Sequence, residues 1–212
     1  MDDAHPIDAR SAIPLADWRR GVFEAYADVR ANPDPMDAWS RWVAVRNDLF
    51  RSHPSSPLPP EARAGFSGLD HFAYDPAART LGDVEPAPTE RVEIGGSAGS
   101  STTFLRIGRV RFELFGEDCS LALYWLDGYG GGLFLPFADA TSGTTTYGAG
   151  RYLLDTVKGA DLGAEDGRLV LDLNFAYNPS CSYDPAWACP LPGSENRLSI
   201  AVRAGERVPV SS

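Results

Sequence analysis

Polar and aromatic side chains that can do chemistry are concentrated in one stretch of the chain, from Phe137 to Asn196. This stretch mixes Asp, Thr, Tyr, Arg, Asn and Cys with many Gly and Pro residues, which suits neither a packed core nor an ordinary surface loop. Such a mixture is typical of the wall and rim of a binding site. The candidate ligand-binding residues are Asp139, Thr141, Tyr147, Arg151, Asp172, Asn174, Tyr177 and Asn178.

Strand parity predicts how some of these side chains meet. Tyr147 and Arg151 fall on one face if the segment TTTYGAGRYL is a regular strand, and Asp172 and Asn174 fall on the polar face of the segment RLVLDLNF. An acid on the second face of an apolar strand is unfavourable unless it is paired, so we expect Arg151 to pair with Asp172. The pair either holds a ligand's negative oxygen or only ties two strands together. The residues leave both alternatives open.

Cys181, Cys189 and His53 form a candidate metal site of mixed ligands, although the two cysteines lack the close spacing of a zinc knuckle. A buried structural thiol or a reversible disulfide is the alternative for the cysteines. His53 ends a predicted helix, where a positive charge interacts favourably with the helix dipole.

Asp139, Asp172 and Glu195 are candidate carboxylates for general acid–base catalysis. The sequence does not say which of them lie close to one another. The Gly-rich stretch from Gly95 to Thr102 lacks the lysine of a phosphate-binding loop and precedes a strand, so we expect a hairpin turn there. No nucleotide-cofactor motif is present, and any cofactor stays unknown.

Composition limits the class of protein. A chain of 212 residues is long enough for one sizeable domain. The net charge of -10 argues against nucleic acid as a partner, and no apolar run approaches the ~20 residues of a membrane span. The N-terminus has no basic start or apolar region of a signal peptide, and the odd number of three cysteines favours free thiols, so we expect a cytoplasmic protein.

The elements that must position the site begin with two helices. We expect a flexible arm over residues 1–13 and a helical cover over residues 14–52, because apolar residues recur there at helical spacing. Asn32-Pro33 separates the two helices, and Asp34 is a suitable cap for the second. Residues 53–62 form a Pro-rich linker. Residues 63–212 form a β domain that makes a single globular unit with the helices.

The period of the apolar residues changes after this linker. Val110, Phe112 and Leu114 alternate with charged residues, which indicates a half-buried strand, whereas residues 121–126 are apolar on both faces and indicate a covered one. Short runs at near-regular spacing predict a mainly β fold. We expect an antiparallel β-barrel or sandwich of about eight or nine strands, with the two N-terminal helices as a cover.

The long polar motifs of the chain resemble domain-of-unknown-function family 1684. The resemblance lies in FADATSGTTTYGAGRYL, in LDLNFAYNPSCSYDPAWACPLP and in ENRLSIAVRAGE, and the upstream segment RNDLFRSHPSSPL is similar to a signature of the same family. It covers most of the chain from Arg46 to Glu206 and implies no activity. It implies only which positions to watch, namely His53, Asp139, Thr141, Tyr147, Arg151, Asp172, Asn174, Tyr177, Asn178, Cys181, Cys189, Glu195 and Asn196.

The sequence favours a small-molecule-binding β domain with one polar pocket for an anionic or carbonyl-bearing ligand. In this hypothesis Arg151 binds the negative oxygen, while Tyr147 and Tyr177 supply flat walls with a hydroxyl each. One alternative is a hydrolase- or lyase-type enzyme that uses a carboxylate or a metal held by His53 and the two cysteines. The other is a protein-interaction scaffold with an exposed aromatic patch around Tyr183 and Trp187. Whether the protein is an enzyme, and its oligomeric state, stay open.

Overall fold

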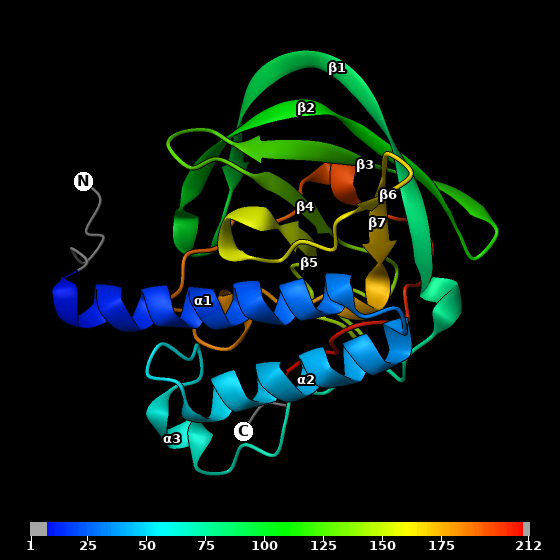
Figure 1. Ribbon diagram of the computed structural model, residues 1–212. Coiled ribbons are helices and arrows are strands. Elements are labelled where there is room, and N and C mark those ends of the chain that lie inside the picture. The colour runs from blue at the N-terminus through cyan, green and yellow to red at the C-terminus, as the bar shows by residue number, and fades with distance from the viewer. Residues whose placement is uncertain (1–7, 210–212) are drawn as a thin grey trace.

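One antiparallel sheet and two long helices on one side of it make up the architecture of the computed structural model, which describes residues 8–209 (Figure 1). All neighbouring strands pair antiparallel, in the order β5-β4-β3-β2-β1-β7-β6. The strands are β1 (Arg79–Gly95), β2 (Ser101–Leu114), β3 (Glu117–Leu126), β4 (Leu133–Phe137), β5 (Arg151–Asp155), β6 (Ala164–Glu165) and β7 (Arg168–Asp172).

The prediction of a mainly β fold is confirmed, and the prediction of a closed or layered sheet of eight or nine strands is not. Within residues 8–209 the sheet has seven strands and ends in two edges, β5 and β6. Two features of the sequence led to too many strands. Residues 79–95 form one long strand that pairs with both β2 and β7, and residues 144–150, expected as a strand, form turns.

The helices follow the predicted cover closely. Helix α1 (Ala9–Ala31) begins before Pro14, because Asp8 and Ser11 form a capping box at its N-terminus. Five residues of the predicted arm are therefore helical, and residues 1–7 lie outside the described residues. Helix α2 (Pro35–Ser52) begins at the predicted cap, where Asp34 accepts from the backbone of Met36 and Asp37. A single turn, α3 (Pro60–Arg63), closes the predicted linker.

Strand β3 is covered on both faces, as its apolar residues predict. Leu121 and Leu123 belong to the main core, which also includes residues of α1 and α2, whereas Ala122 and Tyr124 belong to a smaller core on the opposite face. In β2, Val110, Phe112 and Leu114 are buried as expected. The alternation of two buried faces fixes the register of the central strands.

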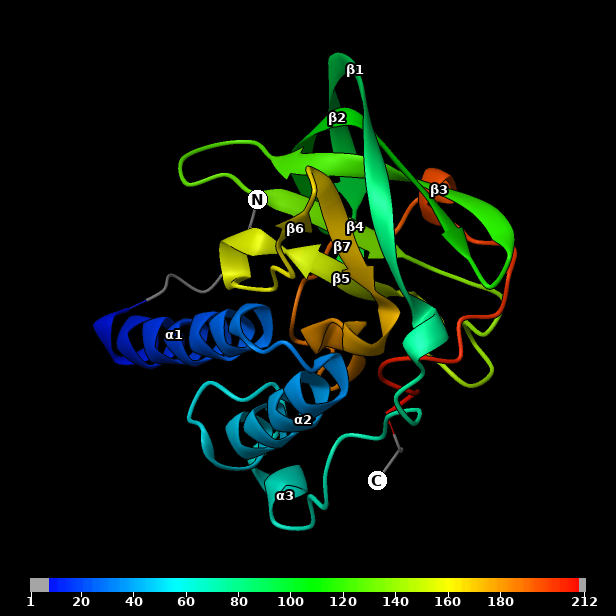
Figure 2. The same ribbon diagram turned by 45° about the vertical axis from the view of Figure 1, so that its right-hand side comes forward.

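The two long helices lie side by side on one side of the sheet, which Figure 2 shows from a second direction. Tyr26 of α1 and Trp42 of α2 contact each other with ring centroids 6.0 Å apart, and Trp42 packs on Phe175 at 5.2 Å. These rings join the helices to the segment that follows β7. None of the helices within residues 8–209 combines the length and the apolar character that a membrane crossing requires.

Candidate functional site

A cavity of about 100 Å³ lies between the two long helices and the segments that follow β5 and β7. Aromatic rings from both layers form much of its wall, and Arg46, Asp155, Lys158 and Asn178 add polar groups. Lys158 is half-exposed, with 53% of its side chain accessible, so it lies at the rim. The aromatic residues that line the cavity are Trp18, Tyr26, Trp42, Phe50, Tyr152 and Tyr177.

Arg46 brings a positive charge to this cavity from the apolar face of α2. Residues 39, 42, 43, 46 and 50 recur at helical spacing, so the guanidinium lies among rings rather than in solvent. Its Cζ atom is 4.8 Å from the ring centroid of Phe50, 4.9 Å from that of Tyr177 and 5.6 Å from that of Trp42. Such contacts stabilise a cation that has lost part of its hydration.

Glu206 holds this arginine in place. The Nε atom of Arg46 donates to Oε1 of Glu206 at 2.5 Å, and the two terminal nitrogens of Arg46 have no hydrogen-bond partner within residues 8–209. Burial acts to lower the pKa of Arg46, but the neighbouring carboxylate outweighs it and raises that pKa above its ordinary value. Arg46 therefore stays charged and keeps donors free.

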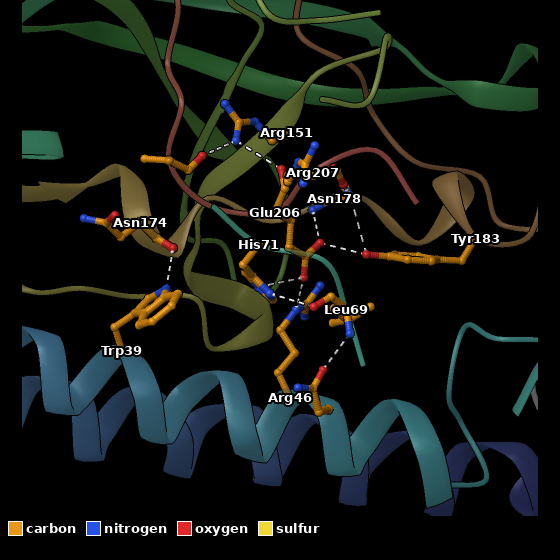
Figure 3. A network of polar contacts seen from close by, with 12 residues as sticks. Trp39, Arg46, Leu69, His71, Arg151, Asn174, Asn178, Tyr183, Glu206 and Arg207 are labelled. Atoms are coloured by element: carbon orange, nitrogen blue, oxygen red, sulfur yellow. Dashed lines mark hydrogen bonds and ion pairs between the residues drawn. The ribbon is translucent and has the colours of Figure 1, made fainter. Parts of the chain in front are cut away.

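Glu206 is itself fully buried and lies at the centre of a polar network (Figure 3). Its Oε2 accepts from the backbone of Asn178 and from the hydroxyl of Tyr183, each at 2.7 Å, and Nε2 of His71 lies 3.8 Å from Oε1. Burial acts to raise the pKa of Glu206, but Arg46 and His71 lower it below its ordinary value. The carboxylate is thus charged and almost fully hydrogen-bonded.

Local backbone geometry determines where Glu206 can lie. The preceding residue, Gly205, has a φ of +75°, and a Cβ atom there would lie 2.5 Å from the carbonyl oxygen of Ala176. Only glycine fits both the left-handed conformation and this close approach. The backbone nitrogen of Glu206 then donates to the same carbonyl at 2.8 Å, which directs its side chain toward α2.

Two buried polar atoms of the cavity-lining residues lack a partner. The hydroxyl of Tyr26 and Oδ1 of Asn178 make no hydrogen bond within residues 8–209, and each residue is only 2% exposed. Buried groups of this kind are rare because each costs about 1–3 kcal/mol of folding free energy. Both residues belong to the lining of the same cavity.

The predicted pair of Arg151 and Asp172 is wrong. Arg151 pairs with Asp139, with Nη2 at 2.9 Å from Oδ2, and both side chains are almost completely buried. Its two terminal nitrogens also donate to the backbone carbonyls of residues 202, 204 and 206, and its buried Nε has no hydrogen-bond partner within residues 8–209. Gly150, with a φ of +94°, turns the chain just before Arg151, so the regular strand on which the parity argument relied does not exist.

Asp139 and Thr141 belong to this closed arrangement. Oδ1 of Asp139 accepts from the backbone and the hydroxyl of Thr141, at 2.8 and 2.6 Å, and from the backbone of Val202 at 3.1 Å. Burial lowers the pKa of Arg151, although Asp139 acts in the opposite direction. No donor of the ion pair faces the cavity described above, whose lining includes none of these residues.

Asp172 and Asn174 hydrogen-bond to each other and to the neighbouring backbone. Asp172 accepts from the backbone and the side chain of Asn174, at 3.0 and 2.8 Å, and Asn174 exchanges two hydrogen bonds with the backbone of Asp75. Burial raises the pKa of Asp172. Asp172 borders a second cavity of about 200 Å³, beside Arg30 and Arg79. It therefore does not join Arg151.

The predicted residues are thus divided among several places. Tyr177 and Asn178 line the cavity with Arg46, together with Cys189. Tyr147 lies next to Cys181, with its hydroxyl 3.9 Å from the sulfur. Glu195 is a surface residue that pairs with Arg106 at 2.7 Å, and the fully buried Asn196 bonds to the backbone of Ala122 and Pro136.

The proposed metal ligands do not form a cluster. Within the described part of the chain, no three His, Cys, Asp or Glu side chains are grouped so as to hold a metal ion. His53 packs edge-on against Trp18 and lies 3.4 Å from Asp17, whereas both cysteines lie in the loop after Asn178. Tyr183, expected in an exposed aromatic patch, packs on Phe50 and bonds to Glu206.

Sequence reasoning missed Arg46, Glu206 and Tyr26. A signal for Arg46 was present, since it is a charged residue within the apolar stripe of a predicted amphipathic helix. Glu206 lies in an irregular C-terminal segment, so no periodicity indicates where it points. Tyr26 is indistinguishable by pattern from any other core residue of α1.

Comparisons with known proteins give a consistent family and no activity. The family model described as "Protein of unknown function (DUF1684)" matches residues 64–207, a span that begins after the upstream segment Arg46–Leu58. No curated protein matches the chain. The solution NMR structure of an uncharacterized protein from Haloarcula marismortui is 33% identical, with a TM-score of 0.59, and the alignment covers 80% of this chain and 92% of that one.

Proposed function

The chain belongs to the family described as protein of unknown function (DUF1684), and we propose that it binds a small anionic or carbonyl-bearing molecule in the cavity at Arg46. The observation that carries this proposal is the state of Arg46. One edge of its guanidinium is paired with Glu206, three rings surround it, and its terminal nitrogens are unpaired within residues 8–209. A fixed cation with free donors suits a carboxylate or carbonyl oxygen.

The rest of the cavity fits the same class of ligand. Tyr177 and Trp42 supply flat apolar walls, while the unpartnered atoms of Tyr26 and Asn178 supply one hydroxyl and one acceptor. A pocket with apolar walls and a few fixed polar groups is typical of small-molecule sites. Its volume of about 100 Å³ is below the ~150 Å³ of a cavity that holds benzene, so we expect a short-chain compound.

Two further expectations are part of this proposal. The acidic chain, with a net charge of -10, favours a small molecule over nucleic acid as the partner. Cys119, Cys181 and Cys189 are all free thiols, which favours a reducing compartment such as the cytoplasm.

A thermal-shift panel of short-chain carboxylates, each with its amide and its alcohol of the same size, tests the proposal. We expect the acids to raise the melting temperature most, because binding to the folded state alone stabilises it in proportion to the logarithm of ligand concentration. Uncharged alcohols that bind as well as the acids would contradict the role of Arg46.

Two tyrosine variants locate the binding site. Tyr26→Phe removes a cavity hydroxyl that has no partner, and Tyr74→Phe removes a hydroxyl outside the cavity, 3.4 Å from Asp172. We expect several-fold weaker binding of the acids to Tyr26→Phe and unchanged binding to Tyr74→Phe. Equal behaviour of the two variants would place the ligand elsewhere.

A further inference from the structure

A buried carboxylate, that of Asp155, lines the same cavity as Arg46. Asp155 is the last residue of β5 and is only 6% exposed. It also directly precedes the short helical turn Thr156–Lys158, where an aspartate usually accepts a hydrogen bond from the backbone of the turn. In the described part of the chain the side chain of Asp155 makes no such capping bond. Its burial is therefore not explained by the turn that follows it.

The backbone of Asp155 is fixed on two sides. It pairs with Phe134 of β4, its nitrogen donates to the carbonyl of Ala160 at 2.9 Å, and its own carbonyl accepts from the nitrogen of Ala160 at 3.1 Å. The carboxylate is thus kept in its buried position by the strand and the turn, and not by hydrogen bonds of its own.

Lys158 is the charged partner of Asp155. Its Nζ atom lies 3.1 Å from Oδ2 of Asp155, and its side chain is half-exposed at the rim, whereas the side chain of Asp155 is buried. Among residues 8–209 no other side chain pairs with this carboxylate. A buried carboxylate is unfavourable unless it is paired and hydrogen-bonded. One exposed ammonium meets this requirement only in part.

Asp155 and Arg46 meet at the same aromatic residues. Cζ of Arg46 is 4.9 Å from the ring centroid of Tyr177, and the backbone of Tyr177 bonds to that of Tyr152, three residues before Asp155 in β5. Burial raises the pKa of Tyr177 well above its ordinary value, and the charge of Asp155 acts in the same direction, whereas that of Arg46 acts against it. One small cavity of about 100 Å³ therefore has a cation and a carboxylate in its wall.

We propose that this cavity binds a short-chain amino acid, whose carboxylate pairs with Arg46 and whose ammonium pairs with Asp155. The inference rests on the proposed function above and adds the second charged group of the ligand. A fixed cation and a buried carboxylate together are complementary to a zwitterion. An ammonium has three donors, and Oδ1 of Asn178, another lining residue, is an acceptor with no partner within residues 8–209. Lys158 already places one ammonium beside Asp155, so the position accepts this kind of group.

Two pairs of ligands that differ in a single group test the proposal on the full chain. Calorimetric titration compares alanine with lactate and 3-aminopropionate with 3-hydroxypropionate, because each pair keeps the carboxylate and the chain length. We expect the amino acid of at least one pair to bind about tenfold more tightly than its hydroxy acid, since a hydrogen bond between charged groups contributes about that factor.

The outcomes separate this inference from the proposed function. Hydroxy acids that bind as tightly as both amino acids would overturn the role of Asp155 and leave that of Arg46 intact. Failure of all four acids to bind would contradict the proposed function and this inference together.

The variant Asp155→Asn locates the ammonium. It keeps the size of the side chain and removes its charge, so we expect about tenfold weaker binding of the preferred amino acid and unchanged binding of its hydroxy acid. Asp118→Asn is the control, because Asp118 is exposed in β3 and lies outside the cavity lining, and it should bind all four acids as the wild type does. An unchanged preference for the amino acid in Asp155→Asn, or an equal loss for both members of the pair, would overturn the assignment. If Asp155→Asn does not fold, the ligand pairs on the wild type decide alone.

Discussion

Arg46 and Glu206 are 160 residues apart in the chain and form a buried ion pair that joins helix α2 to the C-terminal segment. Glu206 occupies only the Nε edge of the guanidinium, so a second face of Arg46 remains in the cavity wall. The pair is therefore both a structural connection and the support of a candidate binding group.

Glu206→Gln should be strongly destabilising. The change leaves Arg46 buried without a counter-charge, and the single amide oxygen of glutamine cannot accept both from Arg46 on one side and from Tyr183 and the backbone of Asn178 on the other. Loss of one partner of a buried pair costs about 3–5 kcal/mol of unfolding free energy. Urea unfolding measures this, with Glu195→Gln as control, since that surface carboxylate should contribute less than about 1 kcal/mol. Similar losses in both variants would contradict the assignment.

Arg151→Met tests the conclusion that the pair of Arg151 and Asp139 is structural. The variant leaves Asp139 buried and removes the donors to three backbone carbonyls, so we expect a loss of about 3–5 kcal/mol of unfolding free energy. Arg203 is exposed, and Arg203→Met should change stability by no more than about 0.5 kcal/mol. A stable Arg151→Met protein with lost ligand binding would restore Arg151 as a binding residue.

Tyr26→Phe should not destabilise the protein in the absence of a ligand. The hydroxyl that it removes is buried and has no partner within residues 8–209, so its loss should raise the unfolding free energy by about 1 kcal/mol. Tyr124→Phe is the matched comparison, because the hydroxyl of Tyr124 donates to Asn196 at 3.3 Å, and its removal should lower stability by about 1 kcal/mol. Urea unfolding measures the free energy of unfolding of both variants. A Tyr26→Phe variant that is less stable than the wild type would mean that the hydroxyl has a structural partner.

Acidification below pH 6.5 should destabilise the protein through His71. Burial lowers the pKa of His71 below its ordinary value of 6.5, although Glu206 acts to raise it. The unfolded state therefore binds a proton more readily, and the unfolding free energy falls as the pH drops from about 6.5 toward the pKa of the folded state. Glu206, whose ordinary pKa is 4.5 and is lowered further, contributes only below that window.

The variant His71→Gln checks this pH dependence. Urea unfolding between pH 7 and pH 5.5 should show a smaller decrease in stability for the variant than for the wild type. Parallel pH curves for the two proteins would mean that another group causes the effect.

The strand and helix pattern was predictable where periodicity was strong. The alternation of Val110, Phe112 and Leu114 and the doubly apolar run after Leu121 both describe their strands correctly. The number of strands was not predictable from the sequence. The long strand β1 carries many exposed residues, so its apolar residues form separate short runs that were counted as separate strands. The positive φ value of Gly150 produces a turn before Arg151. The alternation of side chains along a regular strand, from which we predicted the pair of Arg151 and Asp172, therefore does not apply there.

The chemistry of the chain was only partly visible in its sequence. Tyr177 and Asn178 were selected and do line the cavity, but the cation beside them comes from Arg46 and not from Arg151. The partner of a buried arginine depends on long-range contacts, which residue type and spacing cannot supply. Glu206 pairs across 160 residues and could be found only in three dimensions.

The most direct test of the central claim is a structure of the protein with the strongest acid from the ligand panel bound. We expect a ligand oxygen within hydrogen-bond distance of a terminal nitrogen of Arg46, inside the cavity lined by Tyr26 and Tyr177. A ligand bound at any other place, with this cavity empty and Arg46 unchanged, would contradict it.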